Sequence, residues 1–119
     1  MGGQRFEDLV VWQKAKSISV AIYKAFKNCK DFGFKDQVTR SSLSIPSNIA
    51  EGYERGSNKE FVRFLLIAKG SCGELRTQVL IAAEVDLLAS DKASALVEQA
   101  TEISYMLSSL IKMRRSFSS

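Results

Sequence analysis

The chain has 119 residues, of which 45% are hydrophobic and 25% charged, and its formal net charge is +4. This length suits a single domain, and the regularly spaced apolar content excludes a disordered chain. One proline and seven glycines leave little room for a turn-rich β architecture, so we expect one all-α domain over residues 1–119.

The first two helices are predicted at residues 6–28 and 35–54. In the first, apolar residues recur at steps of three and four, at Val11, Ala15, Ile18, Ile22 and Ala25. The second repeats this spacing at Val38, Ser42, Ile45, Ile49 and Gly52. The segment Asp31-Phe32-Gly33 should separate the two helices. Pro46 should kink the second, because it removes a backbone hydrogen bond; the hydroxyls of Ser41, Ser42 and Ser44 could partly satisfy the freed backbone groups.

The last two helices are predicted at residues 58–88 and 91–115. The third seam comprises Phe61, Leu65, Ala68, Cys72, Leu75, Val79 and Ala82. The fourth comprises Leu96, Ala100, Ile103, Leu107 and Leu110, with Phe117 one heptad further on. Ser57 and Glu60 form a capping-box pattern, and Ser90 or Asp91 should cap the last helix. Because the connections are short, we expect an up-down-up-down antiparallel four-helix bundle.

Small residues gather in the third predicted helix, at residues 68–73 (AKGSCG). They would let another helix approach closely, at a loss of helix propensity of up to about 1 kcal/mol per glycine. The segment is either a notch against which the kinked helix packs or a functional groove.

Polar side chains form a second line along the predicted helix 35–54. They share one face beside the apolar seam: Gln37, Arg40, Ser44, Asn48, Glu51 and Arg55. One interpretation is a buried or subunit-facing hydrogen-bond network, in which Arg40 pairs with a carboxylate such as Glu74. The other is a recognition surface, with Arg40 and Arg55 on phosphates and Asn48 on a base or backbone. The sequence favours the network and leaves the recognition surface open.

Charge is unevenly distributed along the chain. Residues 1–30 hold six basic side chains against two acidic ones, whereas residues 84–102 hold five acidic against one basic. Such regions can steer a polyanion or let identical subunits dock head to tail; the alternative is ordinary solvated helix faces. No helix-turn-helix, RNP or GXXG motif is present. The cations expected to contact nucleic acid are Lys14, Lys24, Lys27, Arg55, Lys59, Arg63 and Lys69.

The sequence holds few residues suited to catalysis. It has no histidine, which removes the commonest general base and metal ligand. Cys29 and Cys72 are far apart, without CxxC spacing, and Cys72 lies in an apolar seam. Glu51 and Glu74 without histidine would make a poor metal site. We therefore expect no enzymatic activity, no catalytic residues, no metal and no cofactor.

The sequence also bears on location. No apolar run approaches the roughly 18–20 residues needed to cross a bilayer, and residues 1–5 lack the apolar core of a signal peptide. Two widely separated cysteines suit a reducing compartment better than a disulfide framework. We expect a cytoplasmic protein with no membrane partner.

Three segments carry a family resemblance: residues 6–15 (FEDLVVWQKA), residues 44–52 (SIPSNIAEG) and residues 57–65 (SNKEFVRFL). The third is followed by Ala68-Lys69-Gly70-Ser71 and by Glu74-Leu75. In this order they resemble the proteins encoded in intervening sequences of bacterial 23S ribosomal RNA genes, also called S23 ribosomal proteins. The resemblance extends from Phe6 to Leu110.

This resemblance implies a four-helix bundle that associates into a ring, typically a homopentamer. A similar fold serves as the accessory variability protein of diversity-generating retroelements, a basic pentamer that binds nucleic acid and a reverse transcriptase. The family has no established enzymatic activity and offers no catalytic residues to carry over. Its signature and structural positions here could serve folding or assembly as readily as binding: Trp12, Arg40, Pro46, Asn48, Glu51, Gly52 and Glu74.

The leading expectation is a non-catalytic oligomeric binding module. It would assemble with itself, by resemblance as a pentamer, and bind RNA or another nucleic acid through its basic surface. The alternative is a structural or adaptor protein whose homo-oligomer presents a surface to another protein.

Overall fold

Four long helices and one short turn make up residues 5–117, the part of the chain that the computed structural model describes. The turn is the 3-10 helix η1 (Phe6–Asp8), and the helices are α1 (Val10–Ala25), α2 (Phe32–Glu54), α3 (Asn58–Glu84) and α4 (Ser90–Arg115). No strand occurs within residues 5–117, in agreement with the predicted all-α class. The predicted domain also includes residues 1–4 and 118–119, which lie outside the described residues.

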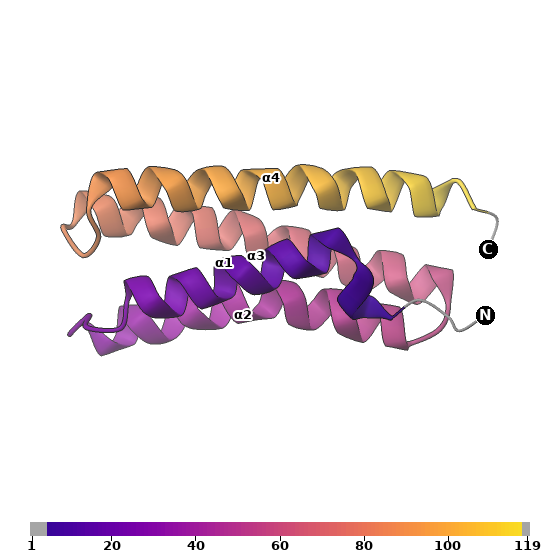
Figure 1. The fold of residues 1–119 in the computed structure, drawn as a ribbon, viewed down its shortest axis with the longest axis horizontal. Coiled ribbons are helices and arrows are strands. Elements are labelled where there is room, and N and C mark those ends of the chain that lie inside the picture. Colours follow the sequence, from indigo (N-terminus) through magenta and orange to yellow (C-terminus); the bar gives the residue numbers. More distant parts are fainter. Residues whose placement is uncertain (1–4, 118–119) are drawn as a thin grey trace.

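Consecutive helices run antiparallel, as the short connections require, and form an elongated molecule of 47 × 22 × 20 Å (Figure 1). α1 packs on α2, α2 on α3, α3 on α4 and α4 back on α1, whereas α2 and α4 make no close backbone contact within residues 5–117. The predicted up-down-up-down four-helix bundle is therefore confirmed. We call the end that holds the turn between α2 and α3, η1 and the last turn of α4 the α2–α3 end (Figure 1).

The predicted apolar seams form the core of the bundle. Burial of such large aliphatic side chains contributes about 1.5–3 kcal/mol each. Those with no exposed surface include Ile18, Ile22, Ile45, Ile49, Leu65, Leu75 and Leu107.

The seam of α4 departs from the prediction at its end. Ile111 is buried, Leu110 is half-buried and Phe117 is 47% exposed. The predicted positions followed a strict seven-residue repeat, but a straight α-helix drifts by about 20° per heptad. The position that faces the core has therefore moved from residue 110 to residue 111.

α1 is shorter than the predicted helix 6–28. It starts later because Leu9 is extended (φ −74°, ψ 125°) and separates η1 from α1. It ends at Ala25, and in the turn that follows, the Cys29 N–H donates to the Phe26 carbonyl at 3.0 Å. The apolar periodicity thus extends past both ends of the helix.

α2 begins three residues earlier than predicted. Its N-cap is Asp31, whose Oδ1 accepts a hydrogen bond from the Phe34 N–H at 3.1 Å. This bond satisfies one of the free donors of the first turn. The expected break at Asp31-Phe32-Gly33 is therefore wrong for Phe32 and Gly33, which are helical.

α2 continues through Pro46, which is buried. The neighbouring serine hydroxyls donate to carbonyls one turn before them: Ser41 Oγ to Val38 at 3.2 Å and Ser42 Oγ to Thr39 at 2.8 Å. Neither bond reaches the Ser42 carbonyl, which Pro46 deprives of its usual donor. The kink at Pro46 stays a prediction.

α3 ends at Glu84 rather than at residue 88. The chain leaves the helix through a Schellman motif, in which the Leu87 N–H donates to the Ala82 carbonyl at 2.8 Å and the Asp86 N–H to the Ala83 carbonyl at 3.3 Å. Asp86 takes the left-handed position of this motif, with φ of 62°. The sequence lacks the glycine that usually marks such an ending.

α4 begins at Ser90 with Ala89 as its N-cap, and no side chain makes a capping hydrogen bond there. The prediction that Ser90 or Asp91 caps the helix is therefore wrong. Helical hydrogen bonding starts one residue earlier, because the Ala93 N–H donates to the Ala89 carbonyl at 2.9 Å.

Candidate nucleic-acid interface

Two of the predicted cations, Arg55 and Arg63, meet around the ring of Phe64 at the α2–α3 end. Their guanidinium carbons lie 5.0 and 4.5 Å from the ring centroid, within the range of cation–π attraction. The turn between α2 and α3 is short, so it places the end of one helix beside the start of the next. We call Arg55, Arg63 and Phe64, with the carboxylates that they contact, the arginine cluster.

Carboxylates neutralise the arginine cluster. Arg63 donates to both oxygens of Glu60 at 3.1 Å each. Arg55 donates to Glu51 at 3.0 Å and to Glu60 at 3.5 Å. The hydrogen bond from Arg63 lowers the pKa of Glu60, and the same contact raises the pKa of Arg63. Two cations are thus matched by two anions, and the cluster holds the turn together while leaving little net charge for a phosphate.

The predicted capping box at the start of α3 is half formed. Ser57 Oγ accepts from the Glu60 N–H at 3.1 Å, as predicted. The reciprocal bond was expected from the Glu60 carboxylate, but its oxygens contact Arg63 and Arg55 instead. Arg63 holds both carboxylate oxygens in a bidentate pair in which both partners are ionised, and this arrangement is favoured over a single bond to a backbone N–H.

A second group of cations lines a shallow groove of about 290 Å³ between α3 and α4. Lys69, Lys112 and Arg115 lie along it, with the Ser108 hydroxyl and the side chains of Leu66 and Ile111. None of the three cations forms an ion pair with a carboxylate of residues 5–117. We call it the basic groove. Its positive charge remains available to an anion such as a phosphate.

Only Lys69 of the basic groove was predicted as a nucleic-acid contact. Lys112 and Arg115 were not, although both lie in the basic last turn of α4. The signal that would have found them is the antiparallel pairing of α3 with α4, which brings the end of α4 back alongside the first half of α3 (Figure 1).

Arg114 lies outside the basic groove and joins α4 to the start of α3. Its Nε donates to Asn58 Oδ1 at 2.7 Å, and Asn58 Nδ2 donates to the Arg114 carbonyl at 2.8 Å. Its guanidinium carbon also lies 4.9 Å from the centroid of Phe61. Through these contacts Arg114 stabilises the packing of α4 against the start of α3.

The other predicted cations are spread over the bundle. Lys59 is exposed one helical turn before Arg63. Lys14 Nζ lies 3.4 Å from Glu102 Oε1 and so joins α1 to α4. Lys24 and Lys27 lie near the opposite end of the molecule, where α1 ends. The structure therefore spreads the predicted set along the elongated bundle instead of gathering it on one surface.

The polar line along α2 is, at its centre, a hydrogen-bond network that faces α3. Ser44 Oγ lies 2.8 Å from Ser71 Oγ on α3. Asn48 Nδ2 donates to the Ser44 carbonyl at 2.8 Å and to Ser44 Oγ at 2.9 Å. A third polar contact, between Ser41 Oγ and Gln78 Oε1, also joins the two helices. The sequence did not reveal Ser71 and Gln78 as partners, because neither shows a distinctive pattern.

The pairing of Arg40 with Glu74 does not form. Arg40 Nε donates instead to Asp36 Oδ2 at 3.1 Å, one turn earlier in the same exposed helix face. Glu74 is exposed and lies 3.5 Å from Gln78 Nε2. Asp36 and Arg40 are one turn apart on the same helix and so lie within reach of each other, whereas a pair with Glu74 would have to span two helices.

Two further signature positions have packing roles. A Cβ atom at Gly52 would lie 2.5 Å from the Cβ of Phe64, so only glycine lets α2 and α3 approach this closely. The ring of Trp12 packs edge-on against Phe6, with centroids 5.2 Å apart, and holds η1 on α1. Both positions therefore serve the fold.

The described residues hold little suited to chemistry. Burial raises the pKa of the Cys72 thiol to about 11, which disfavours the thiolate nucleophile at neutral pH. No three His, Cys, Asp or Glu side chains within residues 5–117 are grouped so as to hold a metal ion. None of the helices in this part of the chain is long and apolar enough to cross a membrane.

Residues 7–109 match the model of the family described as 23S rRNA-intervening sequence protein. The fold is also similar to a crystal structure of a protein with unknown function from the S23 ribosomal protein family of Bacteroides thetaiotaomicron. The two share 27% sequence identity with a TM-score of 0.83, over 87% of this chain and 99% of that one. Neither description names a catalytic activity. No curated protein matches the chain significantly.

Proposed function

This chain belongs to the 23S rRNA-intervening sequence protein family, and on that premise we propose that it is a non-catalytic, self-associating module that binds RNA through the basic groove. The proposal places the protein in the cytoplasm, where its two free cysteines, Cys29 and Cys72, would stay reduced.

The observation that carries the proposal is the contrast between the two groups of cations. The arginine cluster is neutralised by Glu51 and Glu60, whereas Lys69, Lys112 and Arg115 make no ion pair within residues 5–117. Cations without protein partners gain most from a polyanion, because they displace the counterions that surround it. In a self-associated protein, each copy would add one such groove, and several grooves would bind one polyanion more tightly than one.

The composition of the basic groove supports binding to the phosphate backbone rather than to particular bases. Its lining offers cations, one hydroxyl and aliphatic side chains, but no aromatic ring on which a base could stack. Backbone contacts fix the position of a nucleic acid without reading its sequence, and folded RNA is recognised largely by shape. We therefore expect a preference for structured RNA with low sequence specificity.

A salt titration with a structured RNA tests the proposal. We expect log K to fall linearly with log[salt], with a slope of about −0.7 to −0.9 for each phosphate contact. Binding absent even at about 50 mM salt, or binding that does not change with salt, would remove RNA from the proposed function.

The alternative function is an adaptor that binds another protein. The feature that favours it is a set of exposed aliphatic side chains along α3 and at its C-cap, namely Leu66, Ile67, Leu80, Ile81 and Val85. Apolar surface of this kind commonly marks protein contacts. The same salt titration separates the two functions, because an adaptor would show no RNA binding at low salt.

A further inference from the structure

A groove of about 610 Å³ lies between α1 and α2, on the side of the bundle away from α3 and α4. Aromatic and aliphatic side chains line it, and three of them are 44–48% exposed: Val20, Tyr23 and Leu43. Phe6, Trp12 and Pro46 complete the apolar surface. We call it the α1–α2 groove. Exposed apolar side chains gathered in a hollow are typical of a contact surface.

The α1–α2 groove is positively charged. Lys16 and Lys24 are among the described residues that line it, and no carboxylate is. The Lys16 ammonium lies 5.7 Å from the centroid of the Trp12 ring, so this charge sits directly above the apolar surface. An occupant should therefore combine apolar and acidic side chains.

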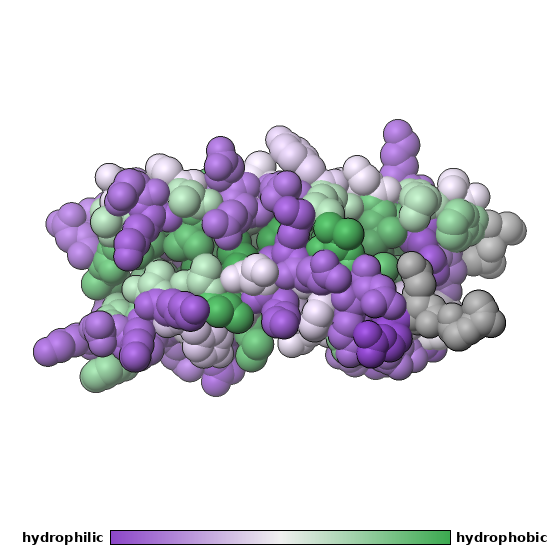
Figure 2. Space-filling model, viewed as in Figure 1, coloured by the Kyte–Doolittle hydropathy of each residue, from purple (hydrophilic) through white to green (hydrophobic). Residues whose placement is uncertain are grey.

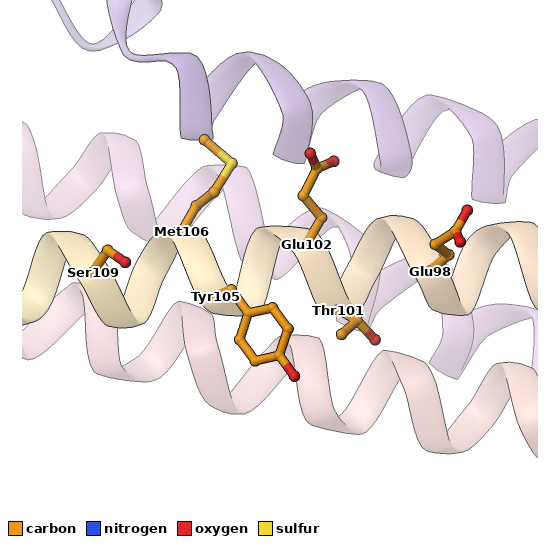
Figure 3. Close-up of a pocket in the computed structure, with 6 residues that line it drawn as sticks. All are labelled: Glu98, Thr101, Glu102, Tyr105, Met106 and Ser109. Atoms are coloured by element: carbon orange, nitrogen blue, oxygen red, sulfur yellow. The ribbon is translucent and has the colours of Figure 1, made fainter.

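One face of α4 has this composition. Glu98, Thr101, Glu102, Tyr105, Met106 and Ser109 share it, and no basic side chain is among them. Figure 3 shows the two carboxylates and Met106 pointing to one side of α4 while Tyr105 points to the other. Tyr105 is 71% exposed. Figure 2, which views the side where α1 and α4 meet, shows apolar residues running along the molecule between hydrophilic ones.

The acidic face and the groove also match in length. Residues 98–109 extend about 16 Å along α4, and residues 12–24 about 18 Å along α1, at 1.5 Å per residue. The α4 face cannot fill the groove of its own chain, because α4 makes no close backbone contact with α2 within residues 5–117. The complementary surface must come from another molecule.

We propose that a second copy of this chain occupies the α1–α2 groove, with the Glu98–Tyr105 face of its α4 between Lys16 and Lys24. The inference rests on the self-association in the proposed function and names the surfaces that form it. The two surfaces differ, so the contact is heterologous, and its repetition from copy to copy generates a closed ring or an open filament. Glu102 already pairs with Lys14 of its own chain and would add Lys16 or Lys24 of the neighbour.

Charge-reversal variants and light scattering test the contact. Lys16→Glu with Lys24→Glu, and separately Glu98→Lys with Glu102→Lys, should each reduce the mass from an oligomer to a single chain of 13.2 kDa. All four substitutions together should restore the oligomer, because the charges are complementary again. Such a recovery would show that the double variants lost the interface and had not simply misfolded.

A matched pair of aromatic variants tests the apolar part. Tyr105→Ala should yield the monomer, whereas Phe32→Ala, which removes a side chain of similar exposure, 73% against 71%, should leave the oligomer intact. Mixing the Lys16→Glu/Lys24→Glu protein with the Tyr105→Ala protein should yield a pair of chains. Each contributes its one undamaged surface, and a pair rather than a larger oligomer is expected because the other two surfaces are damaged.

Three results would overturn the inference. A wild-type mass of one chain would remove self-association from the proposed function as well, while leaving the RNA titration to decide the rest. An oligomer whose mass none of these variants changes would assign the groove to a different occupant and overturn this interface alone. Failure of the two monomeric variants to pair would overturn the heterologous geometry.

Discussion

Gly52 and Gly70 both lie inside long helices, but only Gly52 is needed for packing within the chain. A Cβ atom at Gly52 would lie 2.5 Å from Phe64 Cβ, whereas one at Gly70 would meet nothing within 4 Å. We predict that Gly52→Ala lowers the free energy of unfolding by about 1–3 kcal/mol through overpacking. Gly70→Ala should instead raise it by up to about 1 kcal/mol, because alanine favours the helix.

Urea unfolding at equal protein concentration would measure both glycine variants. The two substitutions add the same atom to a helix, so their opposite signs would isolate packing from helix propensity. A Gly52→Ala protein as stable as the wild type would mean that α2 and α3 can move apart without loss.

The two thiols should differ sharply in reactivity. Cys72 is completely buried, and burial raises the pKa of its thiol from 9.0 to about 11, so only about one part in a thousand is thiolate at pH 8. Cys29 is half-buried. We predict that a thiol reagent modifies Cys29 in the folded protein and reaches Cys72 only after unfolding. Rapid modification of both in the native state would contradict the burial of Cys72.

The same thiol gives a pH dependence with a definite sign. Because the pKa of Cys72 is higher in the folded chain than in the unfolded one, folding favours the protonated thiol. The stability that the protonated Cys72 thiol contributes is fully present at neutral pH and declines as pH rises from about 9 to about 11. Cys72→Ala should lose this alkaline part of the pH profile, which urea unfolding at several pH values would detect.

At the scale of elements, the connection from α3 to α4 lacks a helix cap. Ala89 occupies the N-cap position of α4 without a side-chain hydrogen bond, whereas Ser57 caps α3 through the Glu60 N–H at 3.1 Å. We predict that Ala89→Ser stabilises the protein by about 1 kcal/mol and that Ser57→Ala destabilises it by a similar amount. Thermal unfolding would measure both. Equal melting temperatures for Ala89→Ser and the wild type would contradict the assignment of the cap.

The sequence predicted the helices themselves better than their ends. The spacing of many apolar residues determines which face of each helix is buried. One misassigned position, such as Leu110 in place of Ile111, therefore does not change the predicted bundle. The ends depend on single backbone torsions. Leu9 is extended and Asp86 is left-handed, and neither leucine nor aspartate adopts these conformations regularly enough to mark a helix end.

The candidate site was harder to predict than the fold. The sequence identified Lys69 and Arg63 as cations, but it could not show that Glu60 neutralises Arg63 while Lys69 joins two cations on α4. Which charges remain unpaired depends on side-chain positions across helices. Residues distant in sequence, such as Lys112, enter the site only through the bundle.

At the scale of the whole molecule, the basic groove, the acidic face of α4 and the α1–α2 groove are lined by different residues. The basic groove lies between α3 and α4 toward the α2–α3 end, while the acidic face of α4 and the α1–α2 groove lie elsewhere. This separation lets assembly and RNA binding use different residues. Variants of one surface should therefore leave the other function measurable.

The affinity for a structured RNA at about 100 mM salt, measured for two triple variants, tests the central claim most directly. Lys69→Gln/Lys112→Gln/Arg115→Gln removes the basic groove, and Lys27→Gln/Lys30→Gln/Lys92→Gln removes the same charge from the opposite end of the bundle. We predict that the first weakens binding about tenfold or more and reduces the salt slope by about 2–3, while the second changes affinity less than about threefold. Equal weakening by both variants would contradict the assignment of RNA binding to the basic groove.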